Sequence, residues 1–235
     1  MLSNNFSAAV ITFVVALVWL RANNLTAARG WIGAQLSRKI IHIGTGVFFV
    51  LCWLLFPGYP SARYFAAAVP AVFTLQFLLV GTGIIQDKAT VQSVSRTGDR
   101  RELLKGPLIY GLVFIAITIL FWTDSPAGIV ALMMLCGGDG FADILGSRFG
   151  HSRLPWNPKK SWAGSLGMFT GGFLFSIFVL APFIWRNHFH SPIVDYLLPL
   201  ALISGAATMV ESLPIQDLDN LTITLTAIIL GNLLF

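Results

Sequence analysis

Long apolar segments recur along the whole chain and are separated by short polar connections. A helix needs about 17–25 apolar residues to cross the hydrocarbon core of a bilayer, and slightly fewer where the membrane thins. None of the segments shows the apolar–polar alternation that is typical of a membrane β-strand. The pattern therefore predicts an all-α, polytopic transmembrane bundle of seven or eight helices, at about residues 4–20, 40–56, 63–82, 107–122, 127–144, 163–185, 193–210 and 221–235.

The Lys and Arg residues gather in alternate connections between these segments. Thirteen of the 15 lie within residues 21–39, 86–106 and 145–162, whereas only Arg63 and Arg186 lie on the opposite side. By the positive-inside rule, the basic side faces the cytoplasm. No positive charge precedes the first apolar segment, so we expect a retained anchor and not a cleaved signal peptide.

The composition agrees with a membrane protein. Hydrophobic residues make up 56% of the 235 residues and charged residues only 11%, against roughly 25% charged in an average soluble domain. The mean hydropathy is +0.78. We expect one integral membrane domain over residues 1–235. The basic loops account for the net charge of +5, so no nucleic-acid partner is expected. The oligomeric state stays open.

The acidic residues share the side of the basic ones. Eight of the ten lie there, at Asp87, Asp99, Glu102, Asp139, Asp143, Glu211, Asp217 and Asp219. A transporter tends to place its polar site near the bilayer midplane, often within repeated halves. A polar rim at one face instead favours an enzyme in which a water-soluble reagent meets a membrane-embedded one.

The first candidate site is a pair of carboxylates flanked by glycines. Asp139 and Asp143 are four residues apart, so a helix places them on one face. Mg²⁺ is commonly bound through one or two carboxylates together with substrate phosphates. We therefore expect this pair to hold Mg²⁺. The alternative is a helix end that pairs its acids with the nearby bases Arg148, Lys159 or Lys160.

A second candidate site precedes the sixth apolar segment. Lys159, Lys160 and Ser161 stand directly before it. A helix start offers free N–H groups, and two ammonium groups and a hydroxyl lie beside this one, which makes it a suitable site for a phosphate. Ser161 would also cap the helix. The alternative is ordinary anchoring by basic residues at the membrane interface.

A third cluster lies between the last two segments. Glu211, Asp217 and Asp219 supply three carboxylates, and Asn220 follows them. One of the acids would accept the proton of a hydroxyl nucleophile, or the cluster would hold a second metal ion. Asn220 is a candidate phosphate ligand. The alternative is a solvated acidic loop with Asn220 at the start of the last helix.

Two basic groups complete the rim. Arg38 and Lys39 lie at the entrance of the second segment, with His42 one turn further on, and Arg96 and Arg100 precede the fourth segment. Together they would clamp a triphosphate. Taken singly, each of them is better explained as a surface charge or a snorkelling anchor. The chain contains no P-loop, dinucleotide or protein-kinase motif, so any nucleotide would be bound in another way.

Five motifs in this order resemble the phytol kinase branch of the polyprenol and dolichol kinase family. They are RKIIH at 38–42, SRTGDRRELLKGP at 95–107, GDGFAD at 138–143, NPKKSWAGS at 157–165 and ESLPIQDLDNL at 211–221. The resemblance runs from Arg38 to the C-terminus. It marks residues 38–235 as a kinase-like catalytic core, with residues 1–37 as an N-terminal anchor segment and loop.

The resemblance implies phosphoryl transfer from a nucleoside triphosphate to a prenyl alcohol such as phytol. CTP is the family's usual donor, UTP is a second one, and Mg²⁺ is expected. The product would feed tocopherol synthesis or chlorophyll-related recycling, in a bacterial plasma membrane or a thylakoid.

Two alternatives remain. The CDP-diacylglycerol synthases share a similar Pro-Lys-Lys-(Ser/Thr)-Trp-x-Gly element, which keeps cytidylyl transfer open, although their Pro-Gly-His-Gly-Gly run is missing here. A non-enzymatic transporter of a phosphorylated ligand is the second alternative.

Overall fold

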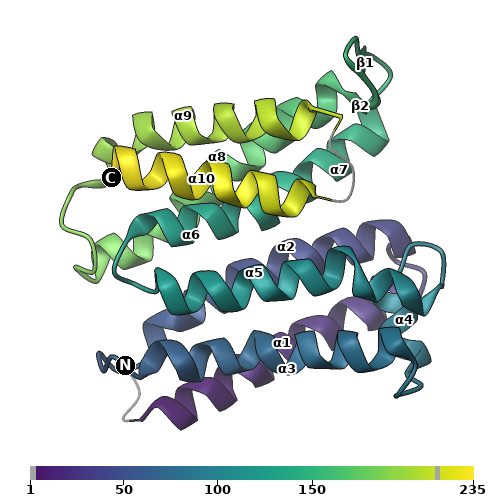
Figure 1. Ribbon diagram of the computed structural model, residues 1–235, viewed down its shortest axis with the longest axis horizontal. Helices are drawn as coiled ribbons and strands as arrows, with labels where there is room; N and C mark the ends of the chain where they lie inside the picture. Colours follow the sequence, from purple (N-terminus) through teal and green to yellow (C-terminus); the bar gives the residue numbers. More distant parts are fainter. Residues whose placement is uncertain (1–3, 215–217) are drawn as a thin grey trace. The chain divides into compact units, whose positions relative to one another are not determined.

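The computed structural model describes residues 4–214 and 218–235 and is almost entirely helical (Figure 1). The α-helices are α1 (Asn5–Ala28), α2 (Ala34–Cys52), α3 (Ala62–Thr82), α4 (Lys88–Val94), α5 (Gly106–Leu120), α6 (Pro126–Met133), α7 (Asp139–Phe149), α8 (Trp162–Trp185), α9 (Ile193–Ser212) and α10 (Asp219–Leu234). Shorter elements join them: the 3₁₀ helices η1 (Trp53–Leu55) and η2 (Arg100–Leu104), the π-helix η3 (Met134–Gly138), and the strands β1 (Arg153–Leu154) and β2 (Asn157–Ser161).

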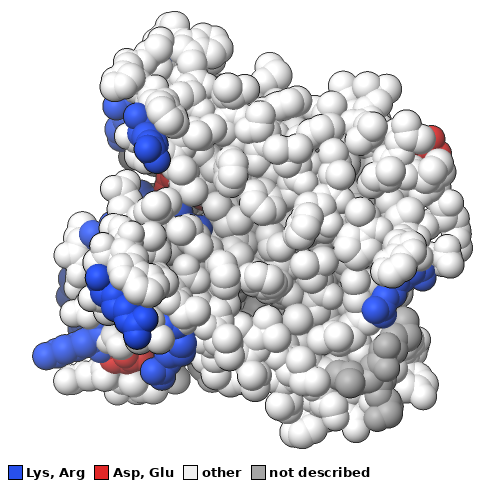
Figure 2. All heavy atoms as spheres, turned by 180° about the vertical axis from the view of Figure 1, so that it is seen from behind, with Lys and Arg blue, Asp and Glu red and all other residues white. Residues whose placement is uncertain are grey.

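Seven helical stretches within the described residues are long and apolar enough to cross a membrane, and α10 is a shorter apolar helix of 16 residues. This confirms the predicted all-α polytopic architecture of seven or eight helices. Uncharged side chains cover the middle of the visible face in Figure 2, where acidic and basic residues are scarce. Such a surface suits a hydrocarbon solvent, in which every backbone polar group must be satisfied inside a helix.

The chain divides into two compact units, and the division falls within α2. The first unit comprises Met1–Ile41 and Leu55–Ile119, in which α1 packs on α3, and α3 packs on η2. Side chains tie its helices together through backbone carbonyls. The Arg63 guanidinium donates to the carbonyl of Ile119 at 3.1 Å.

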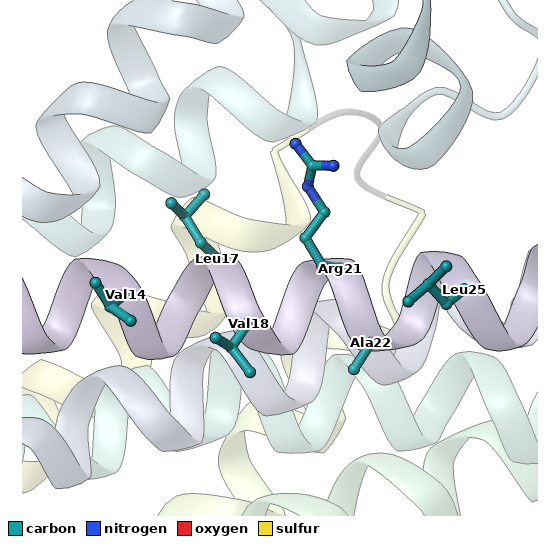
Figure 3. Close-up of a pocket in the computed structure, with 6 residues that line it drawn as sticks. All are labelled: Val14, Leu17, Val18, Arg21, Ala22 and Leu25. Atoms are coloured by element: carbon teal, nitrogen blue, oxygen red, sulfur yellow. The ribbon is translucent and has the colours of Figure 1, made fainter.

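Helix α1 exposes much of its apolar surface. Val18 is 61% exposed, although it lies in the middle of a 24-residue apolar helix. Figure 3 shows side chains of this helix that line an open hollow: Val14, Leu17, Val18, Arg21, Ala22 and Leu25. An apolar, exposed surface of this kind is what a lipid-facing helix presents.

The second unit comprises His42–Leu54 and Leu120–Phe235. Here α8 packs on α7, on η3 and on α9, and α10 packs on α9 and on α6. Glycines allow the close approach of α8 to α7: a Cβ on Gly167 would lie 2.6 Å from the carbonyl oxygen of Phe141, and a Cβ on Gly171 would meet the carbonyl oxygen of Gly137. Small residues are typical of such contacts between membrane helices.

The predicted span at 127–144 is not one regular helix. It comprises α6, the π-helical η3 and α7, and extends to residue 149. The π-helical turn carries one extra residue, so it changes the direction in which the following side chains point. Asp139 is the first residue of α7 and comes directly after this turn.

A short β-hairpin, which the apolar pattern did not predict, precedes α8. Strands β1 and β2 pair antiparallel, with Arg153 opposite Ser161 and Leu154 opposite Asn157. In Figure 1 the hairpin lies at the end of the second unit where α8 begins and α9 ends. Ser161 ends β2 and caps α8, because its Oγ accepts the backbone N–H of Gly164 at 3.1 Å. The predicted capping role of Ser161 is confirmed.

Candidate active site

The ammonium group of Lys160 contacts two acidic residues of the second unit. Lys160 Nζ donates to Glu211 Oε1 in a short contact and to Asp219 Oδ2 at 3.3 Å. Three segments, β2, the end of α9 and the start of α10, thus meet at one cation. The Glu211 side chain is only 4% exposed, whereas that of Asp219 is 30% exposed. A buried carboxylate of this kind requires its charged partner.

The surroundings of Lys160 keep it charged. Burial by itself would lower the pKa of the ammonium group, but the charge and hydrogen bond of Glu211 and the charge of Asp219 outweigh it. Asp139 adds a further favourable charge. The pKa of Lys160 is therefore raised above its ordinary value, and the side chain carries its positive charge throughout the physiological range.

Asp139 lies beside a histidine of α2. His42 Nε2 is 3.6 Å from Asp139 Oδ2 and 3.2 Å from the carbonyl oxygen of Leu135 in η3. A carbonyl oxygen only accepts hydrogen bonds, so Nε2 carries the hydrogen in this bond. The sequence analysis placed His42 in the basic rim but did not predict a role beside Asp139. An isolated histidine in an apolar helix offers no signal for a partner 97 positions away.

Asp139 and Asp143 lie one turn apart on α7, and both are half-buried. Within residues 4–214 and 218–235, no group of three or more His, Cys, Asp or Glu side chains is arranged to enclose a metal ion. Mg²⁺ does not need such a cage, because one or two carboxylates and the phosphate oxygens of a substrate suffice. The pair on α7 fits this mode of binding.

Two further predicted residues of the second unit are sequence neighbours of the cluster: Lys159 precedes Lys160, and Asn220 follows Asp219. Lys159 is exposed, and its backbone carbonyl lies 3.5 Å from Arg153 Nη1. Asn220 is the second residue of α10. It therefore lies at the start of the last helix, where Leu218 holds the N-cap position without a side-chain capping bond. Asp217 lies outside the described residues.

The predicted basic clamp belongs to the first unit, where two of its members bind backbone carbonyls. Arg38 Nη1 donates to the carbonyl of Ser95 at 3.3 Å, and Arg100 Nη1 donates to the carbonyl of Gly81 at 3.1 Å, at the end of α3. Arg96 is exposed and Lys39 is buried. The participation of these four residues in a nucleotide site stays a prediction.

Comparison with known proteins gives strong similarities over the whole chain. A protein from Triticum aestivum named probable phytol kinase is 44% identical over 237 residues, which is 100% of this chain and 79% of the relative. Phytol kinase 1 of Arabidopsis thaliana is 44% identical, with 97% and 75% of the two chains covered. The farnesol kinase of the same plant is 44% identical, with 96% and 74% covered. All three names carry the word chloroplastic. No family model and no solved structure matches the chain.

Proposed function

Because the chain belongs to the phytol kinase family, we propose that it transfers a phosphoryl group from a nucleoside triphosphate to the hydroxyl group of a prenyl alcohol. The observation that carries this proposal is the 44% identity, over essentially the whole chain, with relatives named phytol kinase and farnesol kinase. The predicted choice of phytol as the alcohol is consistent with the first two names. The buried cluster of one ammonium group and several carboxylates supports a reaction that handles phosphate charge.

We propose CTP as the donor, with UTP as the alternative, and Mg²⁺ as the metal. Asp139 and Asp143 would hold the metal from one face of α7, with phosphate oxygens as its other ligands. When bound, Mg²⁺ neutralises part of the charge on the transferred phosphoryl group. His42, whose Nε2 lies 3.6 Å from Asp139 Oδ2, would help to keep that carboxylate in place.

The start of α8 would bind the phosphates. Phosphoryl transfer depends mainly on positioning and on neutralising the charge that spreads over the phosphoryl oxygens. Lys160 supplies a permanent positive charge, Lys159 is exposed beside it, and Ser161 is the residue from which α8 begins. Arg38, Lys39, Arg96, Arg100 and Asn220 remain proposed phosphate ligands, as predicted from the sequence.

Asp219 is the best-suited acceptor for the proton of the alcohol. Glu211 is almost fully buried against Lys160, whereas Asp219 keeps 30% of its side chain exposed and lies further from the same ammonium group. In the reaction the alcohol oxygen forms a bond to the γ-phosphorus, and the bond from that phosphorus to the bridging oxygen of the nucleotide breaks. The hydroxyl proton passes to the carboxylate, and the nucleoside diphosphate leaves.

The membrane setting follows from the helices and the charge pattern. We propose that the protein works as one membrane domain over residues 1–235, with residues 1–37 as an anchor and with the site at the basic, cytoplasmic side. The prenyl chain would lie between apolar helices in contact with the bilayer, and membrane lipid would surround it. The membrane would be a thylakoid or a bacterial plasma membrane, and the chloroplastic names of the relatives favour the former.

The direct test uses the purified protein in detergent with Mg²⁺, phytol and γ-labelled CTP, UTP or ATP. We expect label in the lipid phase, and we expect Asp139→Asn to abolish it. Asp195→Asn serves as the matched control, because Asp195 is an exposed acid in the first turn of α9 and carries no proposed role. Label incorporated only from α-labelled CTP with phosphatidic acid would contradict the kinase and identify a cytidylyltransferase.

A further inference from the structure

A buried asparagine joins the β-hairpin to the end of α9. Asn157 is only 6% exposed, and its Nδ2 group donates to the carbonyls of Ser212 and Leu213 at 3.1 and 3.2 Å. The last carbonyls of a helix have no partner within the helix and must be satisfied in another way. A single amide group therefore supplies both of its hydrogens to two consecutive carbonyls at the end of α9.

This bond lies next to the charged cluster on both sides. Ser212 directly follows Glu211 on α9, and Lys160 is three residues after Asn157 on β2. A second bond supports the same contact, because Trp156 Nε1 donates to Ser212 Oγ at 3.2 Å. The backbone that carries Lys160 is thus fixed to the backbone that carries Glu211, independently of the ion pair between them.

We propose that Asn157 is a positioning residue that holds Lys160 against Glu211 in the geometry required for phosphoryl transfer, an inference that rests on the proposed kinase function. A lysine side chain has four rotatable bonds, so its ammonium group is placed accurately only when its backbone is fixed. A shift of about 1 Å in a catalytic group can cost about 100-fold in rate. The two bonds of Asn157 provide that fixation, and the ion pair alone does not.

The test compares Asn157→Leu with a matched variant. Leucine has the same number of side-chain heavy atoms and the same branch at Cγ as asparagine, but its side chain donates no hydrogen bond. Asn23→Leu is the control, since Asn23 is also buried, at 7% exposure, and its Nδ2 donates to the carbonyl of Trp19 at 2.9 Å within α1. We expect Asn157→Leu to lower kcat/KM for the nucleotide by about 10–100-fold and to leave the KM for phytol within about twofold of the wild type. Asn23→Leu should leave both constants unchanged.

A double-mutant cycle separates positioning from a general loss of structure. If Asn157 acts through the Lys160–Glu211 pair, Asn157→Leu will cost little further activity in a Glu211→Gln background. The proposal would be overturned if the activity losses of Asn157→Leu and Glu211→Gln multiplied in the double variant. Equal kcat/KM values for Asn157→Leu and Asn23→Leu would also overturn it. Should the leucine variant fail to fold, Asn157→Ser replaces it in the same cycle, with Asn23→Ser as its control.

A wild-type protein that phosphorylates no prenyl alcohol from any nucleotide contradicts the proposed function. An active wild type whose Asn157 variants keep their kcat/KM contradicts only the positioning role.

Discussion

For the ion pair between Lys160 and Glu211, we predict that removing the lysine alone costs more stability than removing the glutamate alone or both. The Glu211 side chain is only 4% exposed and depends on Lys160 as its charge partner. Lys160→Met preserves most of the side-chain volume but leaves this carboxylate buried without its cation. Breaking a buried pair in this way costs about 3–5 kcal/mol. For a chain of this size, that loss corresponds to a fall of roughly 6–20 °C in the thermal midpoint.

Removing the carboxylate should cost less. In Glu211→Gln the ammonium group of Lys160 keeps its 3.3 Å contact with Asp219, which is partly exposed to solvent. We therefore expect a loss of about 1–3 kcal/mol, the cost of one unsatisfied polar group. The double variant Lys160→Met/Glu211→Gln should recover much of the stability lost in Lys160→Met, because no unpaired charge stays buried.

The assay is thermal unfolding of the purified protein in one detergent at one pH, followed by helical circular dichroism, with lipid-phase label as the activity readout. Stability and activity should separate: the double variant regains its thermal midpoint but transfers no phosphate. A double variant that is less stable than Lys160→Met would refute the reasoning about the buried charge. A Lys160→Met protein with wild-type activity would refute the proposed contact with the phosphates.

Three further predictions concern packing, capping and pH. Gly167→Ala should lower the free energy of unfolding by about 1–3 kcal/mol because its Cβ meets a carbonyl of α7 at 2.6 Å, whereas Gly205→Ala, with open space around it, should change little in thermal unfolding. Ser161→Ala should cost about 1 kcal/mol through the lost cap of α8, measured in the same way. Burial, and then the charge of Arg186, lower the pKa of His188, so the unfolded state binds its proton more tightly. Stability should therefore fall as the pH drops through and below about 6.5. This fall should be smaller in His188→Gln, and an unchanged pH dependence would contradict the assignment.

The helices were predictable because the bilayer imposes their length and apolar composition. The cap at Ser161 and the one-turn spacing of Asp139 and Asp143 were also predictable, since both follow from positions within one helix. The π-helical turn at Met134–Gly138 was not, because an apolar run has the same composition whether its backbone is α or π.

Contacts between segments far apart in the sequence could not be predicted either. Lys160 and Glu211 are 51 residues apart, and Asn157 and Ser212 are 55 apart. No periodicity within one segment encodes such a pair. The hairpin that carries Lys160 and Asn157 is short and polar, so the hydrophobic pattern gave no sign of its strands. Its role emerges only from the partners that its side chains find on α9 and α10.

The place of Lys160 also bears on how many metal ions the site would hold. The sequence left two roles open for the acids between α9 and α10: a second metal site or a proton acceptor. A metal ion bound by Glu211 and Asp219 would have to share these carboxylates with an ammonium group that already contacts both. A metal ion and an ammonium group bound to the same carboxylates repel each other, most strongly where burial weakens the screening by water. In the proposed mechanism the lysine therefore takes the place of a second metal, so that Asp139 and Asp143 would bind a single Mg²⁺ and Asp219 would accept the proton.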